Sequence, residues 1–287
     1  MKIQAPAKIN IYLKVLSRRA DGYHELRTIM VPLSLSDGIF LAEGGSGIVV
    51  DAPGCSCEEK ENLVYKAAHL FFESTGITSG VTIRVEKRIP VGAGLGGGSS
   101  DAASVLMGMN DLFRTGLGRE DLMLMAGKIG ADCPFFIIGR PMLMGSRGDE
   151  IISEIAIEER AYLLVVPPIG LSTGKVYSAL KSPLTQEKDR FTMHNTLNTI
   201  IMPEQWLEND LETAAFGLCP ELKSIKDELL EAGALGVLMS GSGSSVFGVF
   251  QDTDHVYNAM SCMQRHEGYR YIPTTGLTGE RYGNNRS

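Results

Sequence analysis

The stretch Pro90-Val-Gly-Ala-Gly-Leu-Gly-Gly-Gly-Ser-Ser-Asp-Ala-Ala103 contains five glycines in the seven residues from Gly92 to Gly98. It follows an alternating segment, residues 81–89, that predicts a strand, and it leads into a predicted helix from near Asp101 to about Gly116, with Ser99 and Ser100 as N-caps. Such a loop can turn its backbone N–H groups toward phosphate, because no Cβ blocks the approach and the helix dipole favours an anion. The alternative is a flexible surface loop.

Two established phosphate-binding motifs resemble this loop without matching it. Its glycines fit the dinucleotide-binding string Gly-x-Gly-x-x-Gly, but a proline precedes them and the chain does not continue as regular βαβ units. A Walker A loop has a lysine after its last glycine, whereas two serines follow here. Positive charge must therefore come from elsewhere, and the candidates are Lys8, Lys87 and Arg88.

Residues 8–15 alternate between polar and aliphatic side chains, which predicts a strand. The alternation places Lys8 and Asn10 on one face, opposite Ile9 and Ile11. Taken alone, Lys8 reads as a solvated charge on a strand face. Beside a phosphate loop it becomes the better candidate for the missing cation.

Asp132 lies in the segment Gly-Ala-Asp-Cys-Pro, ahead of an apolar Phe-Phe-Ile-Ile run. Its carboxylate is either a cap for the following helix or a general base. Phosphoryl transfer to an alcohol requires a group that accepts the hydroxyl proton, and an aspartate can supply it.

Two further segments have both a structural and a functional interpretation. The loop from Ser240 to Ser245 (Ser-Gly-Ser-Gly-Ser-Ser) separates predicted strands at 234–239 and 245–251, so it is either a hairpin turn or a place where backbone closely approaches the first loop or a nucleotide. His24 follows the predicted turn Asp21-Gly22. A lone histidine is more often structural than a ligand, and both interpretations stay open.

The composition excludes several classes of protein. Thirty-three of the 287 residues are glycine, against roughly 20 at average usage. The net charge is 27 − 34 = −7, which argues against nucleic-acid binding, and the longest apolar run is too short to span a membrane. Five cysteines without a zinc or disulfide pattern predict reduced thiols in a cytoplasmic protein. We expect no obligate protein partner.

The order of predicted elements suggests two domains. A charge-rich stretch at 148–160 is the best boundary. Before it, Asn62 and Gly76 delimit a predicted helix, and another is predicted at 119–129. After it, the major elements approximate β-α-β-β-α-β, the ferredoxin-like order, with strands near 161–167, 234–239, 245–251 and 269–274 and helices near 173–181, 220–232 and 254–266.

Five segments together resemble one known family. They are Ala5-Pro-Ala-Lys-Ile-Asn10, Arg18-Arg-Ala-Asp-Gly-Tyr-His24, Pro90 to Ala103, Gly130-Ala-Asp-Cys-Pro-Phe-Phe136 and Ser240-Gly-Ser-Gly-Ser. Their order and spacing are similar to the GHMP kinase superfamily. The Arg-Arg-x-Asp-Gly-Tyr-His segment and the long Gly-Gly-Gly-Ser-Ser form resemble the branch that phosphorylates a cytidine-diphosphate-linked alcohol in the non-mevalonate isoprenoid route.

The resemblance implies an α+β fold of two domains: an N-terminal GHMP kinase ATP-binding domain at 1–155 and a C-terminal ferredoxin-like domain at 156–287. It implies ATP with Mg²⁺ as cofactors and a small-molecule substrate. The alternatives are another small-alcohol kinase of the superfamily (for homoserine, mevalonate or a sugar) and a non-catalytic ligand-binding protein of kinase fold.

The resemblance also implies roles for individual residues. Lys8 and Asp132 resemble the catalytic pair. The implied ATP-binding residues are Lys87, Pro90, Val91, Gly92, Ala93, Gly94, Leu95, Gly96, Gly97, Gly98, Ser99 and Ser100. The implied substrate-binding residues are Asn10, Tyr23, His24, Thr173, Tyr177, Gly241 and Gly243. No Mg²⁺ ligand is assigned, although Asp101 is one possibility.

Overall fold

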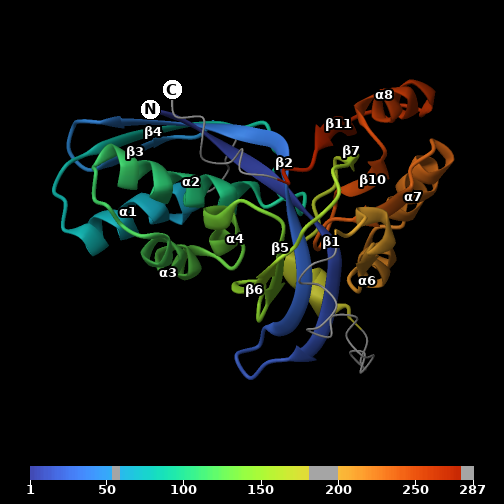
Figure 1. Cartoon of the computed structure of the whole chain (residues 1–287), viewed down its shortest axis with the longest axis horizontal. Helices are drawn as coiled ribbons and strands as arrows, with labels where there is room; N and C mark the ends of the chain where they lie inside the picture. Colours follow the sequence, from blue (N-terminus) through green and yellow to red (C-terminus); the bar gives the residue numbers. More distant parts are fainter. Residues whose placement is uncertain (54–58, 181–199, 279–287) are drawn as a thin grey trace. The chain divides into compact units, whose positions relative to one another are not determined.

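A computed structural model describes residues 1–53, 59–180 and 200–278 of the chain (Figure 1). By its internal contacts the chain forms two compact units. The first contains residues 1–7, 35–91 and 96–139, and the second contains residues 8–34, 92–95 and 140–287. The domain boundary expected after residue 155 stays a prediction.

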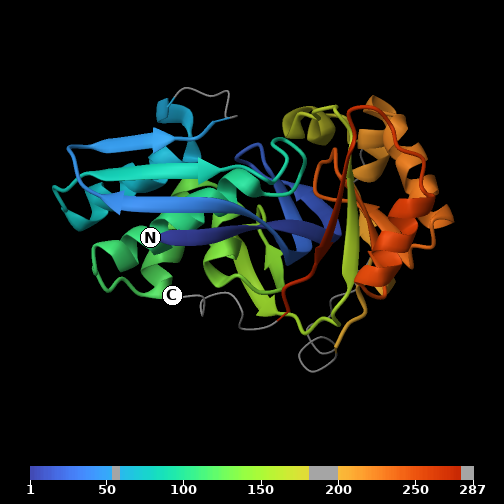
Figure 2. The same cartoon turned by 90° about the horizontal axis from the view of Figure 1, so that it is seen from above.

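The first unit is a sheet with helices on one face (Figures 1 and 2). Its strands are the start of β1 (Lys2–Arg18), the second half of β2 (His24–Glu43), β3 (Ile48–Asp51) and β4 (Val81–Glu86). β2 pairs antiparallel with β4 from Gly38↔Glu86 to Glu43↔Val81, and β3 pairs parallel with β4. The helices are η1 (Glu59–Glu61), α1 (Leu63–Thr75), α2 (Gly97–Leu112), α3 (Arg119–Ile129) and α4 (Cys133–Ile138).

Helix α1 forms where local signals predict it. The Asn62 side chain accepts the Val64 N–H at 2.9 Å, and Gly76 ends the helix in the left-handed conformation at φ 69°. The buried residues recur with helical spacing, so one apolar face packs inward: they are Val64, Ala67, Ala68 and Phe71.

Helix α2 begins one turn earlier than the sequence suggested. It runs from Gly97 to Leu112, so the prediction that Ser99 and Ser100 cap a helix starting near Asp101 was wrong. Gly96 occupies the N-cap position at φ 71°, a conformation that only glycine adopts at little cost. A Cβ on Gly97 would lie 3.0 Å from Ile89 Cγ2, so close packing selects glycine at the helix start despite its low helix propensity.

The second unit contains a four-stranded antiparallel sheet, in the order β11–β7–β10–β9, which the helices α6, α7 and α8 cover on one face (Figure 1). The strands are β7 (Ala161–Val166), β9 (Gly236–Met239), β10 (Val246–Phe250) and β11 (Arg270–Thr275). The helices are α5 (Thr173–Ser178), α6 (Glu212–Leu218), α7 (Glu221–Glu231) and α8 (Thr253–Cys262). This order and pairing confirm the predicted ferredoxin-like arrangement.

Of the remaining strands, β1 and β2 carry candidate site residues. β1 and β2 turn back on each other at Gly22, which has φ 86°, as the Asp-Gly signal predicted. β2 pairs with β5 (Met142–Gly145), which pairs with β6 (Glu150–Glu154). β8 (Glu208–Asn209) follows η2 (Pro203–Gln205) and pairs parallel with β1. No helix in the described residues is long and apolar enough to cross a bilayer.

Candidate active site

Lys8 and Asn10 occupy one face of β1, as the alternation predicted. Lys8 Nζ donates a hydrogen bond to Asn10 Oδ1 at 2.6 Å, and both residues are buried, with exposed fractions of 4 % and 2 %. Asn10 Nδ2 donates to Thr28 Oγ1 at 2.8 Å, and that hydroxyl donates to Tyr12 O at 2.6 Å. This chain of hydrogen bonds fixes the direction of the Lys8 ammonium, because each acceptor is itself held.

The first half of the glycine loop, residues 92–95, contacts the second small-residue loop. Ser240 Oγ donates to Gly94 O at 3.0 Å, and Ser245 N donates to Ala93 O at 3.2 Å. A Cβ on Gly94 would overlap Ser240 O and lie 2.9 Å from Gly243 O. The loop at 240–245 is therefore a hairpin connection and also a place of close backbone approach to the first loop, so both interpretations of it hold.

Gly241 brings this loop to the lysine. Gly241 has φ 57°, and a Cβ there would lie 3.4 Å from both Lys8 Nζ and Asn10 Oδ1. The neighbouring Ser242 hydroxyl lies 2.9 Å from the Thr173 hydroxyl at the start of α5. Five of the predicted site residues thus lie in one continuous set of contacts: Lys8, Asn10, Gly94, Thr173 and Gly241.

The aromatic candidates form a second group within the same unit. His24 stacks on Tyr177 of α5, with ring centroids 5.1 Å apart and an angle of 24° between the planes. Burial lowers the pKa of His24, and the nearby positive charge of Arg18 lowers it further, so the neutral imidazole is favoured at pH 7. Tyr23 is exposed, and the guanidinium of Arg147 lies 5.1 Å from its ring centroid.

The first unit holds the second half of the phosphate loop, where Gly96 leads into α2. Lys87 Nζ forms ion pairs with Asp37 and, at 2.8 Å, with Asp101 of this helix. Asp37 also accepts the backbone N–H groups of Arg88 and Ile89, which precede the loop. A Cβ on Gly97 would lie 3.3 Å from Lys87 Nζ, so the lysine lies directly against the helix start.

Two aspartates share this one lysine, and burial together with the neighbouring charges shifts the pKa values of Asp101 and Lys87. Burial raises the pKa of Asp101 to about 7; Lys87 opposes that rise, and Asp37 adds to it. Burial alone would lower the pKa of Lys87, but the two carboxylates outweigh it and raise the pKa. Lys87 is therefore charged at all physiological pH values, whereas Asp101 titrates near neutrality.

Asp132 lies at the N-cap position of α4, but its side chain makes no capping hydrogen bond to that helix. The next residue, Cys133, is buried, and burial raises the pKa of its thiol to about 12. A hydrogen bond from Ser99 opposes that rise, and the negative charge of Asp132 adds to it. Ser99, which is a predicted ATP-binding residue, thus lies beside the segment that carries Asp132. The pairing of Asp132 with Lys8 stays a prediction.

Three residues that shape these groups were missed at the sequence level: Thr28, Asp37 and Asn209. Thr28 holds Asn10, Asp37 holds Lys87 and the backbone before the loop, and Asn209 bonds the backbone of the loop at 240–245. Only Asp37 lies in a recognisable local pattern, and that pattern misleads: Ser36-Asp37-Gly38 is typical of a turn, although it lies inside β2. Their partners are distant in the sequence, which local patterns do not encode.

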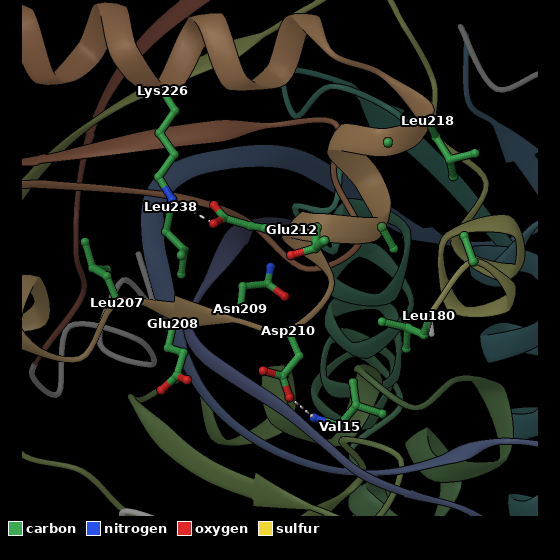
Figure 3. Close-up of a pocket in the computed structure, with 14 residues that line it drawn as sticks. Val15, Leu180, Leu207, Glu208, Asn209, Asp210, Glu212, Leu218, Lys226 and Leu238 are labelled. Carbon is green, nitrogen blue, oxygen red and sulfur yellow. Dashed lines mark hydrogen bonds and ion pairs between the residues drawn. The ribbon is translucent and has the colours of Figure 1, made fainter. Parts of the chain in front are cut away.

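A cavity of about 750 Å³ lies in the second unit, and Figure 3 shows its lining. The charged groups on it are Glu208, Asp210, Glu212 and Lys226. Lys226 pairs with Glu212 at 2.7 Å, and Asp210 Oδ2 accepts the Val15 N–H at 2.9 Å. None of the predicted site residues is among the 14 that line this cavity. The candidate site therefore lies elsewhere in the molecule.

Comparison with known proteins decides the family. The pattern of the GHMP kinases N terminal domain matches residues 62–140, and that of the GHMP kinases C terminal domain matches residues 195–268. The chain belongs to the GHMP kinase family. It is therefore a small-molecule kinase, and the predicted resemblance and α+β fold class are confirmed. Membership of this kinase family also implies ATP as the phosphoryl donor.

Two curated relatives that match over nearly the whole chain carry the same name. A 4-diphosphocytidyl-2-C-methyl-D-erythritol kinase of Syntrophotalea carbinolica is 44 % identical over 268 residues, which are 93 % of this chain and 95 % of that protein. The protein of the same name from Geobacter sp. (strain M21) is 40 % identical over 277 residues, covering 94 % of this chain and 96 % of the relative.

Solved structures of GHMP kinases agree with the fold. A crystal structure of 4-(cytidine 5'-diphospho)-2C-methyl-D-erythritol kinase superposes with a TM-score of 0.81 at 36 % identity, covering 97 % of this chain and 100 % of the other. A homoserine kinase from Cytophaga hutchinsonii superposes with a TM-score of 0.67 at 16 % identity, covering 97 % of this chain and 94 % of the other, which shows the shared fold alone.

Proposed function

We propose that this GHMP kinase transfers the γ-phosphoryl group of ATP to the C2 hydroxyl of 4-diphosphocytidyl-2-C-methyl-D-erythritol, giving the 2-phosphate and ADP in isoprenoid precursor biosynthesis. One observation carries the proposal. A continuous line of contacts joins the Lys8 ammonium through the loop at 240–245 and Thr173 to α5, which presents Tyr177 stacked on His24. A cation for a transferring phosphoryl group and an aromatic surface for a pyrimidine base thus belong to one connected structure.

Each residue group has a part in this reaction. The loop at 90–100 binds the phosphates of ATP through backbone N–H groups at positions where glycine has positive φ, and at the start of α2. Asp132 accepts the proton of the C2 hydroxyl as its oxygen attacks the γ-phosphorus and the bond to ADP breaks. Lys8 stabilises the negative charge on the transferring group, and Asn10 keeps its ammonium directed.

Tyr23, His24 and Tyr177 form the side of the pocket that binds the cytidine diphosphate part of the substrate. The neutral imidazole of His24 can both donate and accept a hydrogen bond to a base, and the tyrosine rings offer stacking surfaces. Thr173, Gly241 and Gly243 bind the substrate closer to the reacting hydroxyl. We place the reaction in the cytoplasm, with this small molecule as the partner.

Mg²⁺ accompanies ATP in this proposal. No group of three or more His, Cys, Asp or Glu side chains in the described ranges forms a ready metal site. Mg²⁺ needs few protein ligands when phosphate oxygens and water complete its octahedron. The Oγ of Ser100 and the Oδ1 of Asp101 are buried, and neither has a hydrogen-bond partner among the residues described. They are the groups in the phosphate half of the site that fit it. Bound there, the ion would neutralise phosphate charge.

The test is a coupled assay of ADP release with purified protein, ATP, Mg²⁺ and the cytidylated substrate, beside homoserine and mevalonate as alternative acceptors. Turnover with the cytidylated substrate alone is expected. Activity on another acceptor would select the alternative of a different small-alcohol kinase, and none on any acceptor would favour a non-catalytic binding protein. Asp132→Asn should abolish nearly all of kcat while ATP binding, followed by calorimetry, survives; near-normal kcat would refute the role of Asp132.

A further inference from the structure

We propose that Asn209 is a positioning residue for phosphoryl transfer, acting by holding the loop at 240–245 against Lys8 and Asn10. The inference rests on the proposed role of Lys8 and extends it to a residue on a separate strand. Asn209 lies at the end of β8 and is buried. It lies in the wall of the cavity seen in Figure 3, where its amide group points away from the neighbouring carboxylate of Asp210.

The side-chain amide of Asn209 makes three hydrogen bonds to the backbone. Nδ2 donates to Met239 O and to Gly241 O, both at 2.8 Å. Oδ1 accepts the Leu211 N–H at 2.9 Å. An uncharged side-chain amide can donate twice and accept at the same time, whereas a carboxylate of the same shape can only accept. The two carbonyls that Asn209 serves therefore select asparagine over aspartate at this position.

One of these carbonyls belongs to the residue that touches the lysine. Gly241 O is held by Asn209, while the Cα of the same residue approaches Lys8 Nζ and Asn10 Oδ1 so closely that a Cβ would lie 3.4 Å from each. Gly241 has a left-handed backbone conformation, and a glycine can leave that conformation for many others at little cost. The hydrogen bond from Asn209 removes that freedom, so the peptide plane beside the lysine has one orientation.

Asn209 is also anchored to the strand that carries the lysine. It pairs with Leu13 of β1, and the next residue, Asp210, donates its N–H to Leu13 O at 3.0 Å and accepts the Val15 N–H on its carboxylate. Asn209 thus contacts both strand β1 and the loop at 240–245. Asn209 therefore sets the distance between Gly241 and Lys8, which are more than 200 residues apart in the sequence.

Glu212 offers a matched comparison, because it supports the same hairpin without reaching the lysine. Its Oε1 accepts the Met239 N–H at 2.9 Å, and its Oε2 pairs with Lys226. Like Asn209, it lines the cavity and bonds the end of β9. Removing Glu212 loosens β9, whereas removing Asn209 loosens β9 and also frees the Gly241 peptide.

The experiment compares Asn209→Ala and Asn209→Asp with Glu212→Ala in the full chain, by steady-state kinetics and by amide hydrogen exchange of the segment 239–246. For both Asn209 variants we expect kcat to fall at least tenfold with the KM for ATP within threefold, and exchange at 241–245 to accelerate at least tenfold. Glu212→Ala should keep kcat within threefold. Should Asn209→Ala not fold, Asn209→Gln, which displaces the amide by one methylene from the two carbonyls, carries the same expectation.

Unchanged kcat in the Asn209 variants, or an equal loss in Glu212→Ala at matched stability, would overturn the proposal. The exchange measurement separates it from the proposed function. A Lys8→Ala variant that keeps full activity would remove the role of Lys8, whereas slow, unaltered exchange at 241–245 in Asn209→Ala would remove the link between Asn209 and Gly241 whatever the reaction is.

Discussion

Lys8 donates to Asn10 across one residue of the same strand, and both side chains are buried. Asn10 is in turn held by Thr28, whose hydroxyl is held by the backbone of Tyr12. A lysine side chain has several rotatable bonds, so fixing it in one conformation costs conformational entropy. In this protein that entropy is lost when the chain folds and not when the substrate binds. The ammonium is therefore oriented before substrate arrives, which is what electrostatic stabilisation of a transition state requires.

Lys8→Ala should lower kcat by a factor of roughly 100–1000, the usual loss when a preorganised electrostatic group is removed. The measurement is steady-state ADP release, with circular dichroism to verify folding. Lys14→Ala is the matched control, because Lys14 lies on the same strand and forms ion pairs with Glu208 and Asp210. It should keep kcat within about threefold, because its ion-pair partners are Glu208 and Asp210 and not the Asn10 side chain that directs Lys8. Equal losses in both variants would mean that strand damage explains the effect of Lys8.

Gly94→Ala should destabilise the protein far more than Gly92→Ala. Both glycines have positive φ, 76° and 70°, so each alanine costs roughly 1–2 kcal/mol in backbone strain. Only at Gly94 would the new methyl group overlap Ser240 O, while nothing lies within 4 Å of the position at Gly92. Urea unfolding should show the larger loss of unfolding free energy for Gly94→Ala. Equal losses would contradict the close approach of the two loops.

Asp101 should make stability fall as the pH rises from about 4 to about 7. Its pKa is raised from the usual value near 3.8 to about 7, so the folded protein binds more protons than the unfolded chain in that window. In Asp101→Asn this contribution disappears. As the pH rises through this window, the wild type should therefore lose unfolding free energy relative to the variant. The largest relative loss is about 4 kcal/mol, because each pKa unit is worth about 1.4 kcal/mol.

Denaturant unfolding at pH 5, 6, 7 and 8 checks the pH dependence. Asp111→Asn serves as its control, because Asp111 is an exposed carboxylate on the same helix α2. That variant controls for the loss of one carboxylate from this helix. If the unfolding free energy of Asp101→Asn changed with pH in parallel with that of the wild type, Asp101 would not titrate in this range.

Tyr177→Leu should raise the KM for the cytidylated substrate by roughly 10–100-fold, since stacking of a base on an aromatic ring is worth about 1–3 kcal/mol. The ring of Tyr177 already stacks on His24, so the aromatic surface is formed by α5 itself. Tyr177→Phe keeps the ring and should stay within about threefold of wild type. A kcat loss without a change in KM would move Tyr177 from base recognition to chemistry.

Much of the fold could be predicted because its signals are local. Asn62 and Gly76 mark the ends of α1 by their own hydrogen bond and backbone conformation, and the order of elements after residue 161 suffices for the ferredoxin-like arrangement. The start of α2 was misplaced because Ser99 and Ser100 are good caps in any sequence. What decides the start is the packing of Ile89 against Gly97, and that contact exists only in three dimensions.

The candidate site was predictable in its residue types and less so in its environment. Alternation placed Lys8 and Asn10 on one face, but it did not show that this face is buried or that Thr28 and Gly241 meet it. Asp37 and Asn209 form hydrogen bonds to backbone groups of distant segments. Because almost every residue has the same backbone groups, such a bond does not require a particular residue type in the partner segment. Such partners leave no pattern in a single sequence.

The division of the chain has a consequence for how this enzyme can be cut or rebuilt. The polypeptide passes between the two units five times, after Ala7, Ser34, Val91, Leu95 and Gly139. Neither unit is a continuous stretch of gene, so a fragment ending at residue 155 would carry Lys8 on a strand deprived of β8 and of the loop that Asn209 holds. Complementation between separately expressed halves, or exchange of halves with another family member, must therefore transplant residues 8–34 and 92–95 together with the C-terminal half.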